Sequence, residues 1–199
     1  MALGTPNRDR RSERRQLIRA EILDAAWAVA REKGLSGLTL KDVASRVGMQ
    51  APSLYSHFAS KNDIYDAMFG QAWAEYEEVD RVAADHRSAS PRERVRRRCL
   101  VFFDFAVADP ARTQLMNRRA IPGFEPSAAS FAPSIRSVQR SVADLAELGV
   151  TDRGDIEILF SMIGGLADQQ LANDPAGDSR RKLVERAVDL WADGVGLPR

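Results

Sequence analysis

The stretch of residues 39–61 constrains the fold more than any other part of the chain. Val43 and Val47 are spaced to share one face of a short helix. Gly48 follows, and glycine readily takes the left-handed conformation that reverses a chain within a few residues. Pro52 suits the first turn of a second helix, where its missing N–H is not needed. The stretch therefore predicts two short helices joined by a tight turn, the second ending near residues 55–58.

Side chains around this unit have the chemistry that DNA binding requires. Small and amide side chains follow the turn, and a helix that is narrow there can enter a major groove about 12 Å wide. Hydroxyl, imidazole and ammonium groups at the helix ends can donate to phosphate oxygens. Taken singly, Tyr55 is more often a packing residue than a phosphate donor, and His57 is about as likely to be a capping or core-edge histidine. The ordered run therefore carries the prediction. The expected phosphate contacts are Thr39, Lys41, Tyr55, His57 and Lys61.

The rest of the chain has helical periodicity and no convincing two-residue alternation, so an all-α fold of about nine helices is expected. We divide it into a disordered basic arm (1–11), a helix-turn-helix domain (12–60) and a helical ligand-binding and dimerisation domain (61–199). A long helix that starts at a Ser60–Asp63 capping box connects the last two. The expected helices cover residues 12–33, 39–48, 52–58, 60–85, 91–108, 110–119, 133–148, 151–173 and 179–193.

Charge and composition fit this division. The chain of 199 residues has a net charge of +1, but residues 1–60 carry +4 and the remainder −3. The basic end coincides with the helix-turn-helix candidate, as expected of a DNA-binding end. The arginine-rich arm either reaches a phosphate backbone or minor groove, or is a solvated tail.

Targeting and cysteine patterns narrow the remaining classes. The N-terminus lacks the apolar stretch of a signal peptide, and no apolar run is long enough to span a bilayer, so a cytoplasmic protein is expected. Cys99 is the only cysteine, which excludes an intramolecular disulfide and a cysteine zinc site. It is either a buried thiol or a redox sensor.

The basic front and acidic helical rear suggest a ligand-controlled switch. Aromatic and methionine residues at helical spacing line either a plain core or a pocket between helices. The pocket candidates are Phe102, Phe103, Phe105, Met116, Phe124, Phe131, Phe160, Met162 and Asp168, with Asp104, Arg118, Arg119 and Gln169 as further polar partners. We expect the last two helices to form a dimer interface through Gly164, Gly165, Leu183, Ala187, Leu190 and Trp191. The basic run Arg92–Arg98 is either a solvated face balanced by Glu75, Glu77, Glu78 and Asp80, or a second DNA contact.

Several short matches together resemble the TetR family of bacterial transcriptional regulators. They are Ile22-Leu-Asp-Ala-Ala26, Gly34-Leu-Ser-Gly-Leu-Thr39, Asp42-Val-Ala44, Val47-Gly48, Ser53-Leu-Tyr55, His57-Phe58 and Lys61, all within about residues 12–70. The resemblance implies an all-helical homodimer that binds palindromic operator DNA and is released by a small molecule. It also implies base-facing roles for Gln50, Ala51 and Ser53. Ala51 departs from relatives with a polar residue there, although it could touch a thymine methyl.

Two other functional classes compete with a ligand-responsive regulator. An enzyme is disfavoured because the chain has two histidines and one cysteine and lacks a glycine-rich phosphate loop, an H-E-x-x-H motif or a Ser-His-Asp candidate. No cofactor and no metal are therefore expected. The alternative regulator has no small-molecule effector, and its rear domain serves only for dimerisation or protein contacts.

Overall fold

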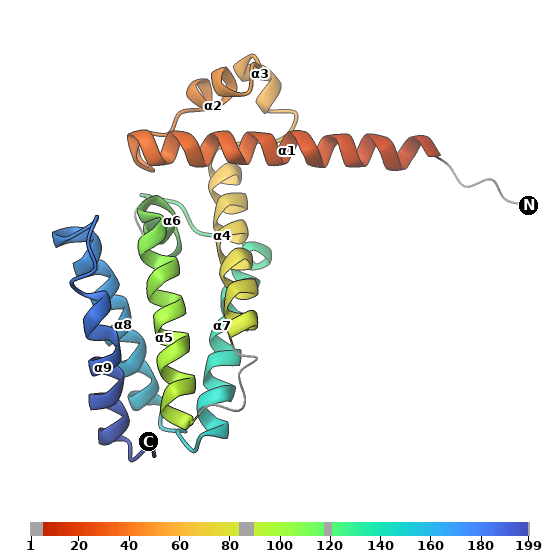
Figure 1. Ribbon diagram of the computed structural model, residues 1–199. Coiled ribbons are helices and arrows are strands. Elements are labelled where there is room, and N and C mark those ends of the chain that lie inside the picture. The colour runs from red at the N-terminus through yellow and green to blue at the C-terminus, as the bar shows by residue number, and fades with distance from the viewer. Residues whose placement is uncertain (1–5, 84–89, 118–120, 199) are drawn as a thin grey trace, which may run out of the picture.

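The computed structural model describes residues 6–83, 90–117 and 121–198, with side chains described from residue 10 onward. All regular secondary-structure elements among these residues are helices, which confirms the all-α prediction (Figure 1). The helices are α1 (Pro6–Lys33), α2 (Leu40–Arg46), α3 (Ala51–Leu54), α4 (Lys61–Ala83), α5 (Pro91–Ala108), α6 (Pro110–Asn117), α7 (Ala128–Glu147), α8 (Arg153–Asn173) and α9 (Arg181–Gly194).

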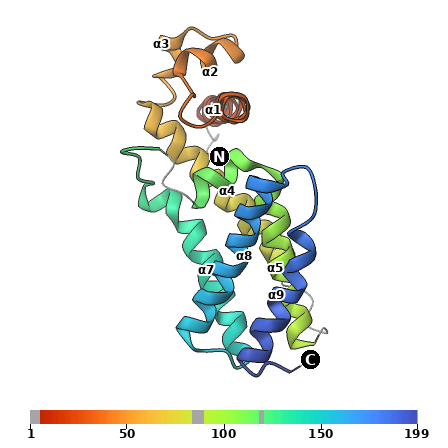
Figure 2. The ribbon, with the colours of Figure 1, turned by 90° about the vertical axis from the view of Figure 1, so that its left-hand side faces the viewer.

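The helices form two layers. Helix α1 lies across the end of α4, with α2 and α3 on its far side (Figure 1). Helices α4, α5, α7, α8 and α9 run roughly along one direction and make up the rear bundle (Figure 2). Helix α4 belongs to both layers, because it starts directly after the turn that follows α3 and continues into the bundle.

Local signals in the sequence set the ends of the connecting elements. The Thr39 hydroxyl accepts a hydrogen bond from the Asp42 amide at 3.1 Å and so caps α2. Gly48 has a φ of +68°, the left-handed conformation expected of the turn residue. The capping box of α4 is also formed, since the Ser60 hydroxyl accepts from the Asp63 amide and Asp63 accepts from the Ala59 amide.

Three expected boundaries differ most from the structure. Helix α1 begins at Pro6, inside the arm predicted to be disordered. Helix α3 ends at Leu54, and the residues up to Phe58 form a tighter turn with hydrogen bonds to Ser53 and Leu54 carbonyls. Helix α7 begins five residues before Pro133, since Ser127 caps it and the proline is accommodated inside the helix. The predicted end of α4 at residue 85 lies outside the described residues.

Two hydrophobic clusters form the core. The first joins α1–α3 to α4 and α6, with Ile22, Leu54 and Leu115 among its buried members. The second joins α5, α8 and α9 around Phe103, Val184 and Val188. The first cluster contains residues from both sides of residue 60. Helices α1–α3 therefore share one hydrophobic core with α4 and α6 and, within the described residues, have no separate core of their own.

Candidate nucleic-acid interface and pocket

The eight residues predicted to contact DNA all keep access to solvent. Thr39 and Lys41 lie at the start of α2. Gln50 precedes α3 and is exposed, Ser53 is exposed within α3, and Ala51 is half-buried and packs against the first core cluster. The other three follow α3: Tyr55 is 55% exposed, while His57 and Lys61 are half-buried. These side chains thus lie on the α2–α3 unit and on the first residue of α4, the end of the molecule farthest from the bundle (Figure 1).

Buried neighbours hold the α3 segment in place. Leu54 and Phe58 are 1% and 3% exposed, so both are core residues. The Arg19 guanidinium lies 4.0 Å from the centre of the Phe58 ring and donates to the His57 carbonyl. Arg15 donates to the Ser56 carbonyl at 3.3 Å. Helix α1 therefore holds the backbone of residues 56–57, which directly follow α3, in place.

Two of the predicted phosphate contacts also have partners within the chain. The Thr39 hydroxyl donates to the Asp42 carboxylate at 2.7 Å, so its proton is already engaged. The Lys61 ammonium lies 5.3 Å from the centre of the Tyr65 ring. The buried Nδ1 of His57 has no hydrogen-bond partner among the described residues. Burial keeps this nitrogen from an external group, whereas the exposed Tyr55 is freer than Thr39 to meet an external acceptor.

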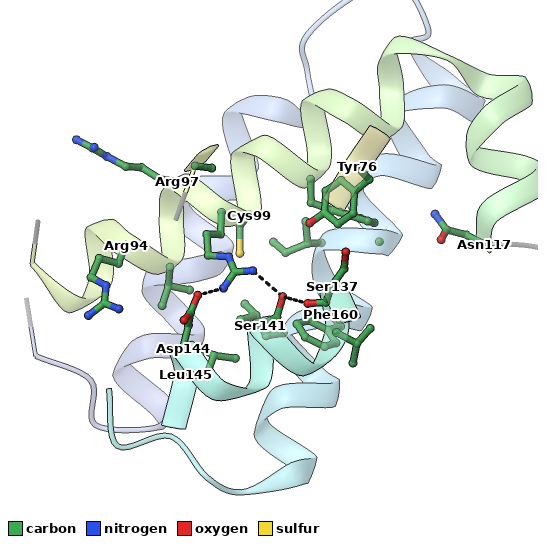
Figure 3. A pocket seen from close by; sticks show the side chains of 18 of the residues that line it. Tyr76, Arg94, Arg97, Cys99, Asn117, Ser137, Ser141, Asp144, Leu145 and Phe160 are labelled. Carbon is green, nitrogen blue, oxygen red and sulfur yellow. Dashed lines mark hydrogen bonds and ion pairs between the residues drawn. The ribbon is translucent and has the colours of Figure 1, made fainter. Parts of the chain in front are cut away.

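A cavity of about 350 Å³ lies in the rear bundle, between α4, α5, α7 and α8 (Figure 3). Its wall is largely apolar and includes Trp73, Tyr76, Phe102 and Phe160. Tyr76 stands at the centre of an aromatic cluster, with its ring centroid 5.9 Å from that of Trp73 and 5.5 Å from that of Phe102. Burial raises the pKa of the Tyr76 phenol well above its usual range.

One side of the cavity is polar. Arg98 pairs with Asp80 and Asp144, and its Nη2 donates to the Ser141 hydroxyl at 2.8 Å. Ser141 in turn donates to the Ser137 carbonyl at 3.0 Å (Figure 3). This network neutralises the guanidinium inside the wall of the cavity.

Two buried polar atoms of the cavity wall, Ser137 Oγ and Trp73 Nε1, have no hydrogen-bond partner among the described residues. A buried polar group without a partner costs free energy, so these two atoms mark where hydrogen-bonding capacity of the wall is unused. No group of three or more His, Cys, Asp or Glu side chains that could hold a metal occurs in the described part of the chain.

Comparison with known proteins shows which family shares this architecture. The model of the bacterial regulatory proteins of the tetR family matches residues 22–68, from α1 to the first turns of α4. The class A tetracycline repressor of transposon 1721 from Escherichia coli is 29% identical over 173 residues, covering 83% of this chain and 73% of the repressor. The chain belongs to the TetR family.

Other relatives agree with this assignment. The HTH-type transcriptional regulator Rv1816 of Mycobacterium tuberculosis is 24% identical and covers 94% of this chain and 81% of its own length. PfmR of Thermus thermophilus, a TetR family regulator, has the same fold, with a TM-score of 0.66, 22% identity and coverage of 89% and 99%. The chain is therefore a helix-turn-helix transcriptional regulator of a non-enzymatic family.

The structure of this TetR chain corrects most of the predicted pocket. Phe102, Phe160 and Asp168 line the cavity, whereas the other six residues do not. Phe103 and Met116 are buried in the two cores, and Met162 packs against the second. The remaining three face other aromatic or cationic groups: Phe105 lies under Arg112, Phe124 packs on Tyr65 and Phe131 stacks on Phe69.

The further polar candidates also lie elsewhere. Asp104 is paired with Arg181 of α9, and the exposed Gln169 is bonded to Asn173. Arg118 and Arg119 lie outside the described residues. Sequence reasoning missed the α4 aromatics Trp73 and Tyr76 and the α7 residues that include Ser137. The helical spacing of these residues was the signal in the sequence. It could be used only with the knowledge that α4 packs against α7.

The residues predicted for the dimer interface fall into two groups. Leu183 and Leu190 of α9 are 41% and 61% exposed, and Gly165 is exposed, so these can meet a partner. Trp191 is 5% exposed and donates to the Asp155 carbonyl at 2.8 Å, which places it inside the protomer. Ala187 packs against the second core, and Gly164 lines the cavity.

The basic run that opens α5 has a structural role. Arg92 donates to the Leu197 carbonyl and to Asp193, which ties the C-terminal turn to α5. Arg94 pairs with Glu147, Arg96 with Glu93 and Asp189, and Arg97 with Glu93. Of the four acids expected to balance this run, only Asp80 does so, through Arg98. No helix in the described ranges is both long and apolar enough to cross a membrane.

Proposed function

We propose that this chain is a ligand-responsive repressor that binds a palindromic operator as a homodimer in the cytoplasm and is released by a small molecule. The observation that carries the proposal is the continuity of α4. Its first residue, Lys61, borders the recognition unit, and its Trp73 and Tyr76 line the cavity. A ligand that favours a different position of α4 would shift the spacing of the recognition helices, to the extent of its differential affinity for the two states.

The residues proposed to contact the operator fall into two groups according to the part of the DNA that each would meet. Gln50, Ala51 and Ser53 would face bases, and Thr39, Lys41, Tyr55, His57 and Lys61 would meet phosphates. Genome-wide mapping of bound DNA would supply the operator. Replacing Tyr55 and Lys61 together with Ala should weaken binding to all sequences and reduce its salt dependence. Unchanged affinity for the mapped operator in this double variant would contradict the phosphate assignment.

The proposed dimer interface is the outer face of α8 and α9. Leu183 and Leu190 lie seven residues apart on α9, so both occupy the same exposed face. Two-fold pairing of this face would place two recognition helices about 34 Å apart, one turn of DNA. Leu183→Glu with Leu190→Glu should give a monomer in sedimentation or light-scattering measurements and abolish cooperative operator binding. A double variant that remains dimeric would move the interface elsewhere.

The proposed effector is an apolar or amphipathic small molecule with a hydrogen-bonding group. The aromatic wall supports an apolar body, and the Trp73 indole N–H and the Ser137 hydroxyl support a polar partner. One solved relative, FadR of Bacillus subtilis, carries stearoyl-CoA; its 19% identity and TM-score of 0.67 show a common fold only.

Two adjacent glycines allow a matched test of the effector site. Gly164 lines the cavity and Gly165 does not, and an added Cβ at either position meets nothing within 4 Å. Gly164→Leu should therefore fill the cavity and leave operator binding intact, so that compounds found to release the wild-type protein no longer act. Gly165 lies on the proposed dimer face, so Gly165→Leu is first checked to remain dimeric; the dimeric variant should then respond to compounds as the wild type does. If no compound releases the wild-type protein in a broad screen, the alternative of a regulator without an effector is favoured.

A further inference from the structure

Helix α1 extends well beyond the core that it helps to build. It has 28 residues, yet residues 10–17 are all exposed and Ile18 is the first that packs against the front core. The overhang from residue 6 to residue 17 is about 18 Å long at the rise of an α-helix. It projects past α3 on one side of the molecule (Figure 1).

The composition of one face of α1 changes where the helix leaves the core. Ile18 and Ile22 face the first core cluster, and residues four apart share a face of a helix. Arg15 and Arg11 continue that face toward the N-terminus. The same face of α1 therefore carries apolar side chains where it packs against the core, and arginines where the helix extends beyond the core.

Contacts with the α3 segment fix the direction of this stripe. Arg19 donates to the His57 carbonyl and Arg15 to the Ser56 carbonyl, at the end of the α3 segment. Arg11 lies one turn further out on the same face and forms no ion pair with a described residue. Residues 10–19 hold five arginines and one glutamate, so the overhang is strongly basic.

We infer that the α1 overhang is a phosphate clamp, in which Arg11 and Arg15 meet the DNA backbone beside the groove occupied by α3. The inference rests on the proposed operator binding. The partner is double-stranded DNA because the stripe is uniformly cationic and continues past the residues placed to meet phosphates. An arginine can pair with a phosphate through two N–H groups, and such contacts add affinity without reading sequence.

Arg10 supplies a matched control for Arg11. The two residues carry the same charge at neighbouring positions, yet they point about 100° apart around the helix. Arg11→Ala should weaken operator affinity about three- to tenfold near 0.15 M salt and lower the slope of log affinity against log salt by about 1. Arg10→Ala should change affinity less than about twofold. Thermal melting of both variants checks that the fold is kept.

DNA length gives an independent readout of the same clamp. Trimming the base pairs that flank the operator should weaken the wild-type protein and Arg10→Ala more than Arg11→Ala, since one of the two clamp contacts is already lost in Arg11→Ala. The clamp would be overturned, with operator binding intact, if Arg10→Ala and Arg11→Ala lost the same operator affinity relative to the wild type. It would also be overturned if Arg11→Ala lost none. A wild-type protein that fails to bind any operator would instead overturn the proposed function.

Discussion

Arg98 on α5 holds Asp80 on α4 through its Nη2 atom, which lies 2.7 Å from both carboxylate oxygens. Asp80 is completely buried, and Nη1 of Arg140 on α7 lies 3.5 Å from its carboxylate. The carboxylate therefore joins three helices, at the end of α4 farthest from the recognition unit.

Asp80→Ala should lower the free energy of unfolding by about 3 to 5 kcal/mol, because removing one partner leaves a largely buried guanidinium without its main counter-charge. Urea denaturation followed by circular dichroism measures the change. The exposed Arg153–Glu157 pair on α8 gives the comparison, and Glu157→Ala should have little effect. A loss below about 1 kcal/mol for Asp80→Ala would contradict the structural role of the pair.

Gly48→Ala should destabilise the protein by about 1 to 2 kcal/mol, because the turn requires a φ of +68° and a Cβ is strained there. Open space surrounds the position, so the cost would come from the backbone alone. Gly48→Asn should lose less, as asparagine tolerates this conformation better. Equal stability of the wild-type and alanine proteins in thermal melts would count against the turn geometry.

Cys99 should react slowly with thiol reagents in the folded protein. Burial raises the pKa of its thiol to about 12 from an ordinary value of 9.0, so the reactive thiolate is scarce at neutral pH. The folded state holds this proton more tightly, so its contribution to stability is complete below pH 9 and is lost as the pH rises toward 12. Labelling with iodoacetamide at pH 8 should be at least tenfold faster in denaturant, and comparable rates would exclude a buried thiol.

Glu77 should contribute to stability in a manner that acid removes. Its hydrogen bond from Arg136 lowers the pKa of the carboxyl below the ordinary value of 4.5. A lowered pKa means that the contribution is complete above pH 4.5 and is lost as the pH falls through the folded-state value. Denaturation midpoints measured from pH 7 to 3 should fall less steeply for Glu77→Gln than for the wild type. Parallel curves would show that the pair between α4 and α7 contributes nothing.

The sequence predicted the elements that depend on local signals. Thr39, Gly48 and the capping box at Ser60 act through neighbours in the chain, so their roles follow from spacing. The pocket depends on which helices face one another, and periodicity does not state that. Phe103 and Phe102 are adjacent in the sequence, yet one fills the core and the other lines the cavity.

The same limit applies to Trp191 and to the start of α1. A large apolar residue on the last helix is equally suited to a partner or to the protomer's own core, and the hydrogen bond to Asp155 shows the second use. An arginine-rich segment with few apolar residues lacks the pattern of a buried helix, although α1 continues through it.

The first core cluster has a consequence for how the molecule comes apart. Ala111, Leu115 and Met116 of α6 are buried in the same cluster as Ile22 and Leu54 of the DNA-binding end. A fragment cut after residue 60 would expose that shared surface to water and would not be expected to keep its shape. The two ends should therefore unfold as one cooperative unit, and structural changes around α6 should alter the conformation of the DNA-binding end.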